Sequence, residues 1–403
     1  MVQTLLTILV CLVVAYFFGE LLHKFKIPRI VGQVGAGLFL GIEIIKKILF
    51  TTEGLETLSF LAHLGIILLF YYVGLEVDFK TMFRTANRSI LISAFNTSLP
   101  LLLGFLVSYF LFDLGVIAGL IVGLCLSVSA QSISIELLEE LRLIKTRIGM
   151  LIISAGMFDD IIELFVITGI LSAIQLGKNK LALLTLFFDT LIFVLIIVAA
   201  RLWFIPFILS FFGKEHSSTA RFTASMIIVL LVASLSEVLG LGLIIGALVA
   251  GMIVRQTIFK DKVLSSWQEH DIANSVHIVA FGFLIPLFFV WIGLSVNLSL
   301  VVENFWLIFL LFVLAIVGTV GGTILAMLLT KGTAKEGLLL GIGLSPKGDI
   351  ELVIAALALE SALITQSIFA ALVMMSMLTT IISPILFTLL SARYVKKNGA
   401  KFS

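Results

Sequence analysis

The sequence has few charged residues and almost no cysteine. Only 12% of its 403 residues are charged, against about 25% in an ordinary soluble domain. Its two cysteines, Cys11 and Cys125, lie far apart within apolar runs, so we interpret them as small buried hydrophobic residues and not as a disulfide or metal pair. The net charge is only +2, and nucleic acid is not an expected partner. These shortages exclude soluble, disordered and disulfide-stapled classes of protein.

Long apolar runs make up most of the chain, and 61% of its residues are hydrophobic. The runs lack the alternation of β-barrel strands. Because a hydrocarbon core of about 30 Å takes about 20 helical residues to cross, we predict an all-α polytopic membrane protein. Breaks rich in charge, proline or glycine delimit thirteen predicted spans, numbered in chain order: residues 3–19, 30–45, 57–75, 89–112, 115–138, 147–174, 181–212, 220–238, 240–257, 273–295, 304–329, 335–359 and 365–391.

The positions of the basic residues predict the orientation of these spans. Lys and Arg collect on cytoplasmic loops, and 20 of the 26 basic residues fall on one side if the C-terminus is cytoplasmic. The N-terminus is then expected outside, and the first span, which lacks a basic leader, is expected to be no signal peptide. The loops are short, so a large extramembrane module is not expected.

Two sequence motifs occur twice, seven spans apart. Residues 70–78 (FYYVGLEVD) at the end of span 3 resemble residues 289–297 (FVWIGLSVN) at the end of span 10. A weaker similarity relates residues 32–37 in span 2 to residues 246–251 in span 9. The charge pattern places the ends of the first two motifs at opposite membrane faces. Such inverted repeats are typical of secondary transporters, whose substrate site lies between the halves near the midplane and is built from interrupted helices.

Two adjacent carboxylates, Asp159 and Asp160, lie well inside span 6. An acidic residue at the centre of a membrane helix costs about 3 kcal/mol and usually marks an ion or proton pathway. Neighbouring helix positions point about 100° apart, so the two aspartates are expected to have different roles. The alternative is a structural polar pair bonded to a neighbouring helix, an interpretation that also fits Glu163 one turn further on.

Charge repulsion predicts what such a pair can do. Two ionised carboxylates this close repel by about 3 kcal/mol at an effective dielectric constant of about 20, and partial desolvation also favours the protonated form. A proton and an alkali cation would therefore compete for one carboxylate near neutral pH. Competition for a single site is the simplest form of antiport.

Two spans contain residues that weaken a helix at its middle. Span 5 has the hydroxyl-rich stretch 127–134 (SVSAQSIS), where freed carbonyls and side chains can supply oxygen ligands. Its counterpart in span 12 is residues 341–351 (GIGLSPKGDIE). Broken helices in corresponding positions of two repeats point to a binding site. The candidate ligands in span 5 are Ser129, Gln131 and Ser132.

The charged residues of the second break have two interpretations. Lys347, Asp349 and Glu351 can compensate the ends of broken helices, or they can pair with Glu136 or Asp160. We favour compensation over direct ion binding.

In these motifs the chain resembles the cation/proton antiporter superfamily, in particular its second branch, which includes bacterial sodium/proton antiporters and glutathione-gated potassium efflux systems. The resemblance runs nearly end to end. It implies thirteen spans with crossed, broken helices 5 and 12, with Asp160 as the carboxylate that carries the ion (Na+, K+ or Li+) and the proton, and Asp159 as its partner. The motifs that carry it are residues 28–32 (PRIVG), 74–78 (GLEVD), 127–134, 137–141 (LLEEL), 159–160, 286–294 (PLFFVWIGL) and 346–349 (PKGD).

The resemblance also implies that one transmembrane unit contains two subdomains with different roles. We expect a mobile ion-binding core of about residues 57–174 and 273–391, and a dimerisation scaffold of about residues 1–45 and 181–257. A homodimer in the cytoplasmic membrane follows, with no cofactor. The chain stops at Ser403 without the gating domain of the potassium efflux systems, so regulation by such a domain is not expected.

One departure from the family pattern bears on stoichiometry. Many relatives that move net charge have a lysine in span 11 paired with the first aspartate, whereas residues 304–329 contain no Lys or Arg. Thr319 lies about where that lysine would fall. The expected function is therefore electroneutral exchange of one monovalent cation for one proton by alternating access.

Other classes of protein fit the sequence less well. A bile-acid-type symporter shares inverted repeats but not an adjacent Asp pair. An intramembrane aspartyl protease, the enzyme alternative, needs its two aspartates on different helices and a Gly-x-Gly-Asp context that is absent here. A channel suits a single site between two repeats less well than alternating access.

Overall fold

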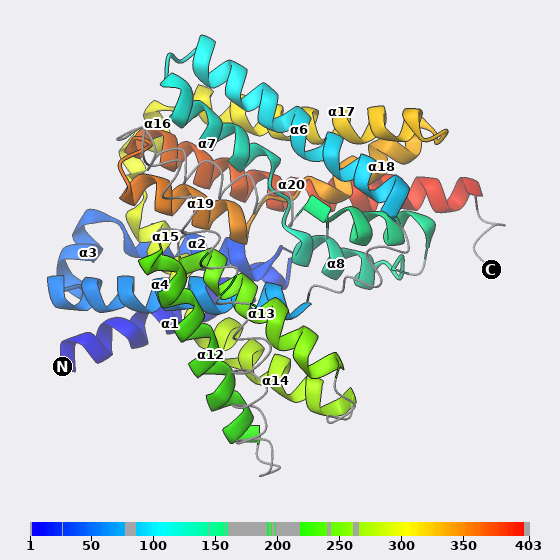
Figure 1. The fold of residues 1–403 in the computed structure, drawn as a ribbon. Coiled ribbons are helices and arrows are strands. Elements are labelled where there is room, and N and C mark those ends of the chain that lie inside the picture. Colours follow the sequence, from blue (N-terminus) through cyan, green and yellow to red (C-terminus); the bar gives the residue numbers. More distant parts are fainter. Residues whose placement is uncertain are drawn as a thin grey trace. The chain divides into compact units, whose positions relative to one another are not determined.

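The fold is helical throughout the part of the chain that the structure describes (Figure 1). The structure is a computed structural model and describes residues 2–25, 27–76, 86–144, 146–156, 158–159, 192, 195, 198, 218–239, 243–260 and 266–398. The prediction of an all-α protein is confirmed. The helices are α1 (Val2–His23), α2 (Arg29–Leu40), α3 (Glu43–Leu49), α4 (Thr52–Glu76), α6 (Ala86–Phe110), α7 (Gly115–Ser127), α8 (Gln131–Glu140), α12 (Ser218–Val238), α13 (Leu243–Lys260), α14 (Ser266–Val279), the π-helix η2 (Ala280–Leu284), α15 (Ile285–Ser295), α16 (Leu298–Glu303), α17 (Phe305–Leu329), α18 (Ala334–Leu344), α19 (Asp349–Glu360) and α20 (Gln366–Asn398).

Many of these helices can cross a membrane. Only helices and closed barrels satisfy every backbone group in lipid. Among the described residues, six apolar segments are long enough to span: Val2–His23, Thr52–Leu75, Arg88–Phe110, Ala273–Ser295, Phe305–Leu329 and Gln366–Ala392. Five shorter apolar helices accompany them: Arg29–Leu40, Gly115–Ser127, Arg147–Gly156, Phe222–Val238 and Leu243–Arg255. Most of predicted spans 6 and 7 lie outside the described residues, so the count of thirteen stays a prediction.

The chain divides into two compact units. One comprises Met1–Leu12, Phe50–Asp78 and Leu171–Trp291, and the other comprises Val13–Leu49, Phe79–Ile170 and Ile292–Ser403. The division into a core of residues 57–174 and 273–391 and a scaffold of residues 1–45 and 181–257 stays a prediction.

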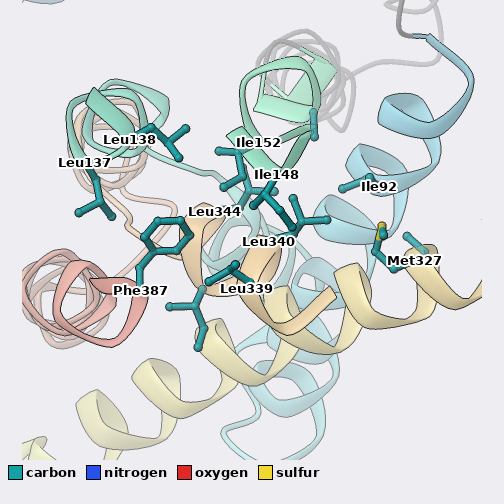
Figure 2. Close-up of a cluster of buried hydrophobic side chains, with 13 residues drawn as sticks. Ile92, Leu137, Leu138, Ile148, Ile152, Met327, Leu339, Leu340, Leu344 and Phe387 are labelled. Atoms are coloured by element: carbon teal, nitrogen blue, oxygen red, sulfur yellow. The ribbon is translucent and has the colours of Figure 1, made fainter. Parts of the chain in front are cut away.

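An apolar cluster holds together one end of the second unit. Figure 2 shows its side chains pointing toward one another from α8, the helix Arg147–Gly156, α18 and α20, with contributions from α6 and α17. Lipid is as apolar as these side chains, so within a membrane the cluster is stabilised by van der Waals packing between the helices. The cluster fixes the helices that carry the two broken segments. Its labelled members are Ile92, Leu137, Leu138, Ile148, Ile152, Met327, Leu339, Leu340, Leu344 and Phe387.

Glycines set the spacing of α6 and α17, which lie side by side (Figure 1). A methyl group at Gly318 of α17 would overlap Pro100, and one at Gly322 would overlap the carbonyl of Phe95. The same holds where α6 meets α7, since a methyl group at Gly104 would overlap Gly123. Small residues let membrane helices approach this closely. The helix α6 is thereby in close contact with both α7 and α17.

The glycines of the repeated motifs pack in equivalent ways in the two units. In the first unit, Gly74 lies against the backbone of α13, where an added methyl group would overlap Leu248 and Gly251. In the second unit, Gly293 lies against the backbone of α2 and would likewise overlap Gly37. Each copy of one motif therefore packs on a copy of the other motif. This reciprocal packing agrees with an internal repeat.

These contacts predict that Gly74→Val destabilises the protein. The added side chain meets backbone that cannot rotate away, and overpacking of this kind costs about 1–3 kcal/mol. The measurement is the melting temperature of the detergent-purified protein. The matched control is Gly282→Val, because a Cβ at Gly282 has nothing within 4 Å. Equal melting temperatures for the two variants would contradict the packing argument.

Candidate ion-binding site

Predicted span 5 is broken at its middle, as expected from its serines. The helix α7 ends at Ser127 and α8 begins at Gln131. The Ser127 hydroxyl donates to the carbonyl of Leu124 at 2.8 Å, and such local bonds compete with continuation of a helix. The backbone N–H of Ala130, which lies in the break, donates to the carbonyl of Pro346 at 2.8 Å.

Predicted span 12 is broken at the matching place. The helix α18 ends at Leu344 and α19 begins at Asp349, with Pro346 between them, which has no N–H and cannot continue a helix. Two threonines of α20 hold the freed backbone of Lys347. Thr379 accepts from its N–H at 3.3 Å and Thr380 donates to its carbonyl.

The two breaks meet each other. Besides the bond between Ala130 and Pro346, the Ser134 hydroxyl donates to the carbonyl of Gly343 at 2.7 Å. A methyl group at Gly348 would lie 3.0 Å from the side chain of Ala130. The prediction of broken helices 5 and 12 that cross is confirmed.

The charged residues of the second break lie at helix ends. Lys347 is fully buried, and its Nζ donates to the carbonyl of Ser127 at 3.2 Å, the last residue of α7, and to Thr319 Oγ1 at 3.4 Å. Asp349 and Glu351, both buried, lie in the first turn of α19. A cation at a helix C-terminus and anions at an N-terminus are favourable. This geometry supports helix-end compensation; Glu136, the other suggested partner of Lys347, is exposed on α8.

Asp159 is fully buried and accepts three hydrogen bonds from one face of α6. Ser93 Oγ and Thr97 Oγ1 donate to its Oδ1 at 2.6 Å and 3.0 Å. Asn96 Nδ2 donates to its Oδ2 at 2.8 Å. The three donors share a face because residues three and four apart on a helix are neighbours. Lys347 is a charged neighbour of the same carboxylate.

The sequence analysis missed these three donors. The sequence does contain a signal for these donors, because Ser93, Asn96 and Thr97 interrupt the otherwise apolar span 4 at the spacing of one helix face. All three side chains are buried. Polar groups buried in a membrane protein need partners, and here that partner is a carboxylate.

The other predicted site residues are only partly described. Ser129 lies buried in the first break, and its Oγ accepts from Asn96 Nδ2 at 3.2 Å. Gln131 points elsewhere, since its Nε2 donates to the carbonyl of Ile153 at 3.1 Å. Asp160, Glu163 and the side chain of Ser132 lie outside the described residues. The roles predicted for all of them stay predictions.

The arrangement places several oxygen atoms close together in a buried space. Asp159, Ser129 and Asn96 form one connected group beside the crossing of the two breaks. Helix breaks in a membrane are tolerated where they line a cavity or are buried in protein, and oxygen atoms of this kind can replace the hydration shell of an alkali ion. A buried carboxylate beside two crossed helix breaks defines the class as secondary transporters.

Comparison with known proteins gives the family. Residues 8–392 match the transmembrane sodium/hydrogen exchanger family, and the chain belongs to it. The chain is 28% identical over 366 residues to the Na+/H+-K+ antiporter GerN of Bacillus cereus, covering 91% of this chain and 90% of that protein. It is 29% identical over 388 residues to a Na+/H+ antiporter of Enterococcus hirae, covering 94% and 96%.

A solved structure supports the fold. The sodium/proton antiporter MjNhaP1 of Methanocaldococcus jannaschii superposes with a TM-score of 0.68 at 15% identity, covering 94% of this chain and 96% of that one. At this identity the likeness bears on the fold alone. The family match favours the exchanger interpretation over the symporter and protease alternatives.

Proposed function

We propose that this chain exchanges a monovalent cation, Na+ or K+, for H+ across the cytoplasmic membrane by alternating access. The observation that carries the proposal is the buried carboxylate of Asp159 beside the crossing of two broken helices. Relatives that match nearly the whole chain are sodium/proton antiporters by name, which supports the same chemistry. Exchange is tested with everted vesicles, in which addition of the cation dissipates a preformed proton gradient.

In this proposal Asp160 is the residue that carries the ion and the proton. It binds a proton from one side, releases it, and then binds the cation in its place. Asp159 is its partner: burial disfavours its charged form, and three neutral donors with nearby Lys347 oppose this by stabilising the charge. Ser129, Gln131 and Ser132 remain proposed oxygen ligands, and Glu163 a structural polar residue.

The protein is further proposed to work as a homodimer, with its N-terminus outside and its C-terminus in the cytoplasm. The distribution of Lys and Arg supports this orientation. No cofactor is proposed, and the chain is not proposed to be an enzyme.

Exchange is expected to be electroneutral. Thr319 on α17 contacts the ammonium of Lys347, and this ammonium also bonds the end of α7. We propose that Lys347 stabilises these helix ends and does not carry a second proton. A membrane potential would then have no effect, although it contributes about 2.3 kcal/mol per 100 mV for each net charge moved. The measurement is Na+ uptake by proteoliposomes with a fixed pH gradient and potentials of either sign. Uptake that follows the sign of the potential would disprove one-for-one exchange.

A further inference from the structure

We propose that Asn96 binds the transported cation through its amide oxygen and contributes to the choice among alkali cations. The inference rests on the antiport function proposed above. It adds a ligand from α6 to a site whose other proposed residues lie on predicted spans 5 and 6.

The hydrogen bonds of Asn96 fix which way its amide faces. The Nδ2 atom donates to Asp159 Oδ2 at 2.8 Å and to Ser129 Oγ at 3.2 Å. A carboxylate oxygen without a proton can only accept hydrogen bonds, and the contact of Asp159 Oδ2 is with the amide nitrogen, which therefore faces Asp159. The amide oxygen is bonded to the same carbon and therefore lies beside this carboxylate and the first helix break.

That oxygen has no hydrogen-bond donor among the described residues. Asn96 is fully buried, and its Oδ1 atom is without a partner although its Nδ2 atom has two. A buried acceptor left unsatisfied costs about 1–3 kcal/mol. A bound cation would satisfy it. The buried carboxylate of Glu351 differs from this amide oxygen, because Ser376 is a hydrogen-bonding neighbour and Lys347 a charged neighbour of Glu351.

The backbone carbonyl of Asn96 also lacks its usual helical donor. Pro100 lies four positions further along α6 and has no N–H, so the helix does not provide the usual donor to the carbonyl of Asn96. Neutral oxygens change the coordination of a cation without changing the charge of the site. Selectivity among alkali ions depends on the number and spacing of such oxygens.

The test compares Asn96→Leu with Thr97→Val in the everted-vesicle assay, using Li+, Na+ and K+ in turn. Both variants remove one hydrogen bond to Asp159, but only Asn96→Leu removes the unpartnered oxygen. We expect Asn96→Leu to raise the apparent KM for the preferred cation about tenfold or more, equivalent to about 1.4 kcal/mol. The ratios of KM among the three cations should change as well. Thr97→Val should change KM for all three by a similar factor.

A second variant and a binding measurement distinguish the loss of a cation ligand in Asn96→Leu from a folding defect. Asn96→Gln keeps the amide and displaces its oxygen by one methylene, and it should also alter the KM ratios. Added Na+ should raise the melting temperature of the purified wild type, since a ligand that binds only the folded state stabilises it. This rise should be smaller for both Asn96 variants.

The outcomes separate this inference from the proposed function. If the wild type exchanges none of the three cations, the proposed function is wrong. If the wild type exchanges a cation and the Asn96 variants keep its KM ratios and its Na+-dependent stabilisation, Asn96 only positions Asp159 and the inference is overturned.

Discussion

Asp160→Asn is expected to abolish exchange of H+ for Na+, Li+ and K+ alike. An amide of nearly the same shape cannot take up and release a proton near neutral pH, so cation binding is no longer coupled to proton release. The measurement is dequenching of a pH-sensitive dye in everted vesicles, with each cation added in turn. Activity should fall to that of vesicles without the protein.

Asp159→Asn provides the comparison. Its carboxylate receives three neutral hydrogen bonds from α6, and an asparagine can keep part of that network through its amide oxygen. A milder loss is therefore expected at Asp159 than at Asp160. Full activity of Asp160→Asn would remove Asp160 from the mechanism, and an equal loss at both positions would show that the two aspartates do not differ in role.

Lys347→Met is expected to destabilise the folded protein strongly. The ammonium of Lys347 is fully buried, bonds the end of α7, and is the charged neighbour of both Asp159 and Glu351. Removing one partner from a buried charge group costs about 3–5 kcal/mol. The measurements are the yield of monodisperse protein in detergent and its melting temperature.

A second substitution tests the reason for this loss. In Lys347→Met with Glu351→Gln, one uncompensated carboxylate is removed along with the cation, so stability should recover in part. The control is Lys331→Met, since Lys331 lies in the connection between α17 and α18. A single Lys347→Met variant as stable as the wild type would refute the compensation argument.

Some of the site could be predicted from the sequence because it depends on local chemistry. The hydroxyl-rich stretch around Ser129 and the proline at Pro346 weaken helices wherever they occur, and both breaks lie where the pattern placed them. The positions of Lys347 and Asp349 at helix ends follow from the same breaks. Helix-end charges need no knowledge of the tertiary fold.

The partners of Asp159 could not be predicted in this way. Ser93, Asn96 and Thr97 form a polar face, but such a face is also typical of close helix packing in membranes. Which helix it faces depends on how α6 packs, and glycines such as Gly318 and Gly104 set that packing over long separations in sequence. The reciprocal contacts of Gly74 and Gly293 could not be predicted for the same reason, since they join segments that are far apart in sequence.

The backbone bond between Ala130 and Pro346 has a consequence for the transport cycle. It ties two segments more than two hundred positions apart directly, main chain to main chain, and the threonines of α20 fasten the second of them. Two helix breaks joined by a backbone hydrogen bond are expected to move as one body. In the proposed alternating-access cycle, the oxygens on the two breaks then keep their mutual spacing whichever side the site faces, so the ion is expected to meet the same set of ligands from either side of the membrane.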